Sequence, residues 1–175
     1  MRRALIGLAL MLAAMPAGAQ IAGKTIDNCG NKNVDISIAA CTAMLTAKPA
    51  MSTDWRLAAY YARGQSYSEK GLEDRAIADF TSAMALRPEL QTLVNLQGSI
   101  SMSYIRKHLY AESIASSSKM IELKPDDADG YQLRGYAYEL DGQRDQAIAD
   151  YRTTLKFHPD AENVKQALTR LGVTP

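Results

Sequence analysis

The sequence has very few of the residues from which metal centres and catalytic sites are usually built. Its 175 residues include two cysteines and two histidines. His108 and His158 lie far apart in the chain, and two cysteines are too few to complete a tetrahedral metal site. The sequence also lacks a nucleophile elbow, a glycine-rich phosphate loop and a paired-histidine motif. These absences predict no metal, no cofactor and no enzymatic activity, although a hydrolase with a site assembled from distant residues is an alternative.

Strong charge and long apolar stretches are scarce too. The net charge is +1, and the basic residues form no run, so nucleic acid and anionic membranes are poor candidate partners. One apolar stretch, residues 4–15, follows Arg2 and Arg3 and precedes Ala17-Gly18-Ala19, which has the A-x-A form of a signal-peptidase site. This stretch is too short to cross a bilayer. The sequence therefore predicts a signal peptide at residues 1–19, cleaved after Ala19, and a soluble exported protein.

Both cysteines lie near the start of the exported chain. Cys29 and Cys41 are an even pair, and oxidising compartments outside the cytoplasm favour disulfides. A structural disulfide between them is the favoured interpretation, because their spacing is not the C-x-x-C of redox-active pairs. The bridge would tie down residues 20–33, where glycines and asparagines predict coil.

The main positive feature of the sequence is a repeat. Gly64, Gly98 and Gly135 are 34 and 37 residues apart, and prolines recur at positions 49, 88, 125 and 159. Between these marks the segments SIAAC, AIADF, SIASS and AIADY begin at residues 37, 76, 113 and 147. Each unit fits two short amphipathic helices that are too small to be stable alone. The pattern therefore predicts helical hairpins that stack on one another.

These residues resemble the tetratricopeptide repeat (TPR), which has a period of 34, small residues and an aromatic at its helix contact, and a closing proline. The resemblance is strongest over residues 57–90 and 128–161. It is weaker over 91–127, where Ser113 and Ser117 replace alanine and an aromatic, and where three extra residues are expected between Gly98 and Ser113. Residues 34–50 fit a partial repeat. The resemblance implies an all-α, right-handed superhelical stack of TPR hairpins over residues 34–175.

The pattern predicts helices at about 34–47, 53–70, 73–86, 89–107, 110–123, 127–140, 144–157 and 161–171. We interpret the last of these as a capping helix that covers the end of the stack, with a partner-docking helix as the alternative. Its polar outer face would consist of Lys165, Gln166, Thr169 and Arg170.

The resemblance also implies a concave groove, lined by the first helix of each hairpin, that holds an extended or helical peptide. Simple solvent exposure is the alternative for each groove position. Repeats that bind chaperone carboxylates carry Lys, Arg and Asn in this groove, whereas Tyr61, Gln65, Leu96, Asp129 and Leu133 stand at those places here. A carboxylate clamp is therefore not expected. The predicted partner-binding residues are Tyr61, Gln65, Asn95, Ser99, Gln132 and Tyr136, with Ala58, Thr92 and Asp129 beside them.

Together these features predict a protein-interaction module in the periplasm of a Gram-negative bacterium, or secreted from it, that binds a peptide or protein partner during envelope assembly or secretion. A self-associating scaffold is the alternative, with contacts through a stack end or the serine-rich run 113–118. Arg106, Lys107 and His108 fall near a predicted turn. They fit either a small anion-contacting loop or an added helical turn with a solvated tip.

Overall fold

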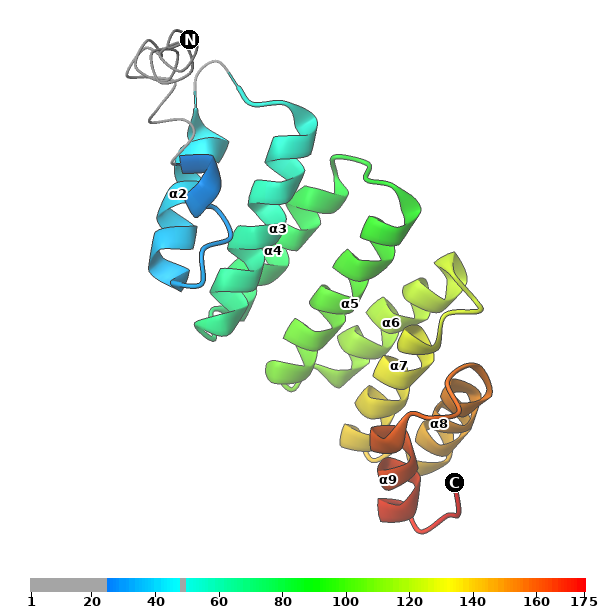
Figure 1. Cartoon of the computed structure of the whole chain (residues 1–175). Helices are drawn as coiled ribbons and strands as arrows, with labels where there is room; N and C mark the ends of the chain where they lie inside the picture. The colour runs from blue at the N-terminus through cyan, green and yellow to red at the C-terminus, as the bar shows by residue number, and fades with distance from the viewer. Residues whose placement is uncertain (1–24, 48–49) are drawn as a thin grey trace, which may run out of the picture.

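The computed structural model describes residues 25–47 and 50–175, and the secondary structure in these ranges is helical (Figure 1). The predicted signal peptide, its cleavage site and Pro49 lie outside the described residues. Residues 25–28 form one helical turn, so the prediction of coil throughout 20–33 is wrong. The other helices are α2 (Val34–Thr46), α3 (Thr53–Glu69), α4 (Glu73–Met84), α5 (Leu90–Arg106), α6 (Tyr110–Leu123), α7 (Ala128–Leu140), α8 (Arg144–Phe157) and α9 (Glu162–Arg170).

The helices form three hairpins, α3 with α4, α5 with α6 and α7 with α8, and each hairpin packs against the next (Figure 1). Helices α2 and α9 lie at the two ends of the stack. The predicted all-α stack with a C-terminal capping helix is confirmed. No described helix is both long and apolar enough to cross a membrane.

The turn inside each hairpin has the same backbone geometry. Gly71, His108 and Gly142 have φ angles of +70°, +58° and +76°, and the residue after each donates its N–H to a tyrosine carbonyl five residues earlier, at 2.9 Å in all three turns. This is a Schellman motif. It favours glycine at the residue in the left-handed conformation, because the side chain of any other residue would clash there. His108 therefore stands at a glycine position, where its ring contacts the ring of Tyr110 at a centroid distance of 5.9 Å.

This common turn defines which residues of the three hairpins are equivalent, and it changes the alignment that the spacing of the glycines had suggested. Measured from the turns, the residue equivalent to Gly64 and Gly135 is Ser101, not Gly98. The three extra residues therefore lie before Ser101, where they lengthen α5, and the prediction that they follow Gly98 is wrong. The error arose because Gly98 happens to lie one period from Gly64.

The true contact positions show why small residues recur there. A Cβ atom added to Gly64 would lie 2.7 Å from the ring of Phe80, and one added to Gly135 would lie 3.0 Å from the ring of Tyr151. In the middle hairpin Ser101 faces Ser113, with their hydroxyl oxygens 2.7 Å apart and both residues fully buried. Ser116 and Ser117 are buried as well. The serine-rich run therefore packs inside the stack, which removes it as a self-association surface.

Two largely buried ion pairs close the first and last hairpins, and the arginine of each also binds the helix that precedes its hairpin. Arg134 donates to both carboxylate oxygens of Asp150, at 2.7 and 2.8 Å, and to the hydroxyl of Ser118 on the preceding hairpin at 3.2 Å. Arg63 makes the same bidentate pair with Asp79, at 2.8 Å, and reaches Thr42 of α2 at 3.0 Å. Each arginine thus binds two helices besides its own, which fixes the position of its hairpin against the preceding helix, α2 for Arg63 and α6 for Arg134.

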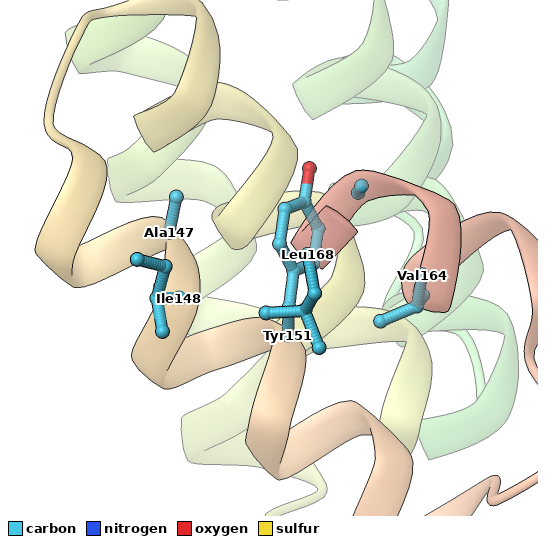
Figure 2. Packing of buried hydrophobic residues seen from close by; sticks show 6 residues of the cluster. Ala147, Ile148, Tyr151, Val164 and Leu168 are labelled. Carbon is cyan, nitrogen blue, oxygen red and sulfur yellow. The ribbon is translucent and has the colours of Figure 1, made fainter. Parts of the chain in front are cut away.

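Both ends of the stack are covered. At the C-terminal end, Val164 and Leu168 of α9 point toward Tyr151 of α8 in a common apolar cluster (Figure 2). At the N-terminal end the predicted disulfide between Cys29 and Cys41 is present, and it holds the short helical turn of residues 25–28 so that Ile26 packs on the apolar cluster of α2 and α3.

We predict that Gly135→Leu lowers the free energy of unfolding by about 1–3 kcal/mol, because the new side chain overpacks the contact with Tyr151. Gly98→Leu is the control, since a Cβ atom there meets the flexible end of Met120 at 3.3 Å and replacing a helical glycine favours the helix. Urea melts of the two variants measure the difference. An equal loss in both would contradict the assigned register.

Candidate functional site

A hollow of about 690 Å³ lies between α5, α7 and α9. Each of these helices lines it with residues at positions i, i+3, i+4 and i+7, the spacing that places side chains on one face of a helix. We call this hollow the α5–α7–α9 groove. Its lining residues on the three helices are Asn95, Gly98, Ser99 and Met102; Asp129, Gln132, Leu133 and Tyr136; and Asn163, Val164, Gln166, Ala167 and Arg170.

The groove has polar walls and an apolar floor. Met120 of α6 and Tyr151 of α8 also line it, and we call these two residues, together with Leu133, its floor. Gly98 has no side chain, and the space beside it is closed only by the methyl and sulfur of Met120, at 3.3 and 3.5 Å from a Cβ atom placed there. The amide and hydroxyl groups of the walls can donate to and accept from a peptide backbone. Methionine side chains can adjust their shape to an apolar group that enters.

The carboxylate of Glu139 attaches the α9 wall to the rest of the groove. Glu139 accepts hydrogen bonds from the hydroxyl of Tyr151 at 2.6 Å and from Nε and Nη2 of Arg170 at 2.9 and 3.1 Å. Burial disfavours its charged form, but the hydrogen bonds from Arg170 and Tyr151 outweigh burial and hold the pKa of Glu139 below its ordinary value. Burial and this hydrogen bond raise the pKa of Tyr151. The network therefore links α7, α8 and α9 through one ionised carboxylate.

Two smaller hollows extend the concave surface toward the N-terminus. One, of about 370 Å³, lies between residues 30–32 and α3, and the other, of about 270 Å³, lies between α3 and α5. Gln65 lines both of these, and Ser99 lines both the second and the α5–α7–α9 groove. The three hollows are therefore adjacent along the stack.

The structure brings four of the six predicted partner-binding residues together in the α5–α7–α9 groove: Asn95, Ser99, Gln132 and Tyr136. Gln65 lies in the smaller hollows instead. Tyr61 packs in the first hairpin, where its ring lies 6.0 Å from that of Phe80.

Sequence reasoning missed the contribution of α9, which it treated only as a cap. Gln166 and Arg170 face the groove, so assigning both to the outer face of the cap is wrong. The repeat contained a usable indication, because Asn163, Gln166 and Arg170 follow Asp129, Gln132 and Tyr136 at the period of 34.

The basic residues at the turn of the middle hairpin are engaged within the stack. Arg106 Nη1 lies 3.6 Å from Glu73 Oε1, and Lys107 pairs with Asp74. Both acids belong to the preceding hairpin, so these cations join two hairpins and do not form a free anion-contacting loop.

The tetratricopeptide repeat family model matches residues 57–90 and 128–160, the first and last of the three hairpins. These two hairpins are therefore tetratricopeptide repeats. The Hsp70-Hsp90 organizing protein of Triticum aestivum is 32% identical over 107 residues, which are 61% of this chain and 18% of that protein. This TPR chain thus spans less than a fifth of the length of its curated relative.

Solved structures share the TPR fold at low sequence identity. MamA from Desulfovibrio magneticus RS-1, solved from its residue 41 to the end, is 18% identical with a TM-score of 0.72, and the match covers 90% of this chain and 85% of that chain. The second TPR domain of human RPAP3, solved in complex with the HSP70 peptide SGPTIEEVD, is 20% identical with a TM-score of 0.61, over 69% of this chain and 98% of that domain.

We predict that Glu139→Gln destabilises this TPR protein by about 1 kcal/mol at neutral pH, a modest value because Arg170 is solvent-exposed. The pKa of Glu139 is depressed in the folded state, so its contribution is present above the ordinary value of 4.5 and is lost as the pH falls through the folded pKa. The difference from the wild type should therefore shrink below about pH 4.5. Urea melts at neutral and acidic pH measure this difference in the free energy of unfolding.

Glu162→Gln, at an exposed pair with Lys165, is the control. An effect of equal size in this variant would contradict the assigned network.

Proposed function

We propose that this protein is a protein-interaction module that holds a segment of a peptide or protein partner in the α5–α7–α9 groove. The observation that carries the proposal is the groove itself, in which amides and hydroxyls of three helices surround an apolar floor. Its volume of about 690 Å³ falls in the range of pockets that enclose ligands, from about 300 to 1,000 Å³. Backbone groups of a bound segment would pair with Asn95, Gln132 and Gln166, while an apolar side chain would rest on Met120 and Leu133.

Two further observations support this role. The apolar clusters at the ends of the stack are packed against α9 and against the disulfide-linked turn of residues 25–28, which leaves less apolar surface at the ends for self-association. In addition, a TPR domain of the same fold, that of RPAP3, has been solved with a bound peptide. Binding without catalysis is the chemistry that a groove of amides and apolar groups supports best.

The proposal places the encounter with the partner outside the cytoplasm, in the periplasm, during envelope assembly or secretion. Two features support this location. Residues 1–19 have the pattern of a signal peptide, and Cys29 and Cys41 form a disulfide, a bond that persists in oxidising compartments.

A photo-crosslinking amino acid at position 132, inside the groove, should form adducts with the partner in cells, whereas the same group at position 146, on the exposed outer side of α8, should not. Gly98→Leu should abolish the adducts at 132, because its side chain fills the groove next to Met120, while the variant keeps its stability. Adducts that persist in Gly98→Leu, or that form equally at position 146, would show that the partner binds elsewhere.

The exported protein should begin at Gln20 and contain no reactive thiol. Mass spectrometry of the protein purified from the periplasmic fraction, with and without a thiol-alkylating reagent under denaturing conditions, measures both properties. Retention of Met1 to Ala19 in a cytoplasmic protein, or alkylation of both cysteines, would contradict the proposed location.

A further inference from the structure

The α5–α7–α9 groove carries charges at its two ends, and only one of them is neutralised. Arg170 is bound in a bidentate pair by Glu139. Asp129, in the first turn of α7, is exposed and forms no ion pair with another described residue. The groove therefore has the unpaired carboxylate of Asp129 at one end and, at the other, the guanidinium of Arg170, whose charge is neutralised by Glu139.

The surroundings of Asp129 add to the negative charge. Lys124 lies near it, but the ammonium of Lys124 is already bound by Asp127 at 3.0 Å and by the amide oxygen of Gln91 at 3.1 Å. A hydrogen bond to Asp127, together with the charges of Asp127, Asp126 and Asp129, raises the pKa of Lys124. Three carboxylates thus surround one cation. This end of the groove keeps an excess of negative charge.

Polar acceptors and an apolar floor complete the recognition surface. Asn95 of α5 and Asn163 of α9 occupy the same position in the helical pattern as Asp129, and all three residues line the groove. An ammonium group has three hydrogens and needs several such acceptors. Leu133 follows Asp129 by four residues, about 6 Å along the helix, and Met120 lies beneath it in the floor.

We propose that the groove selects a partner segment in which a lysine or arginine lies two residues from an apolar side chain, with the cation at Asp129 and the apolar group over Leu133 and Met120. In an extended chain, side chains two residues apart point the same way and are separated by about 7 Å, which is close to the rise of about 6 Å from Asp129 to Leu133 along α7. This inference rests on the proposed function and names the class of partner. An acidic segment would meet repulsion at Asp129 and no free cation on the groove lining.

The test uses the full-length mature protein, immobilised and exposed to pools of end-blocked nine-residue peptides with random flanks. The pools share a central leucine and differ only two residues before it, where they carry lysine, glutamine or glutamate. We expect the lysine pool to be retained about three- to tenfold better than the glutamate pool, and the preference to weaken as salt is raised. The HSP70 peptide SGPTIEEVD serves as an acidic reference and should not compete.

Matched variants assign the preference to one carboxylate. Asp129→Asn should remove the discrimination between lysine and glutamate, while the variant still retains all three leucine-containing pools above the level of Gly98→Leu. Asp54→Asn is the control. It also removes an exposed acid, from the first turn of α3, and it should leave the discrimination between lysine and glutamate unchanged. Equal retention of the three pools, or a preference for glutamate, would overturn this inference alone. Retention of no peptide above the level of Gly98→Leu would remove the proposed function as well.

Discussion

The contact between Gly135 and the ring of Tyr151 connects the core of the last hairpin with the wall of the groove. The ring packs where Gly135 has no side chain, and this close approach carries the tyrosine hydroxyl to Glu139, which in turn binds Arg170 on α9. Because α9 is only nine residues long, it is too short to be stable as an isolated helix. Its position depends on this network and on the burial of Val164 and Leu168 against α8. The same tyrosine therefore holds the hairpin closed and fixes one side of the proposed binding surface.

The middle hairpin differs from its neighbours through an exchange of bulk along its second helix. The first and last hairpins pair a large residue with a small one three positions later, as Phe80 with Ala83 and Tyr151 with Thr154. In the middle hairpin this order is reversed, since small Ser117 precedes large Met120. The second helix of the middle hairpin thus still carries one large and one small side chain, but the large side chain lies about one helical turn further along the helix. Met120 comes to lie under Gly98, where it forms the floor of the groove. The feature that weakens the family pattern in this repeat thus shapes the candidate site.

The helices and their stacking could be predicted from the sequence because they depend on local signals and on a repeated pattern. Ser52 and the turn glycines Gly71 and Gly142 mark helix ends by their own conformational preferences. The register of the middle repeat could not be predicted in this way. His108 replaces the turn glycine there, and Gly98 lies one period after Gly64 although Ser101 is the residue at the equivalent helix contact. Side-chain networks were also out of reach. Nothing in the identity of Arg170 distinguishes a solvated residue from one bound to Glu139, since that depends on how two helices meet.

The peptide bound by the RPAP3 domain differs in charge from the segment that we propose for this chain, although the two chains share a fold. A groove that captures an acidic peptide end needs cations whose charge is still available, because the energy of a charged hydrogen bond is lost when the donor is already paired. Arg170 is the one cation among the described residues that line the groove, and its guanidinium is already paired with the carboxylate of Glu139. The carboxylate of Asp129 has no such partner. We infer that a shared backbone can support different charge preferences, which depend on which groove residue finds a counter-ion within the protein.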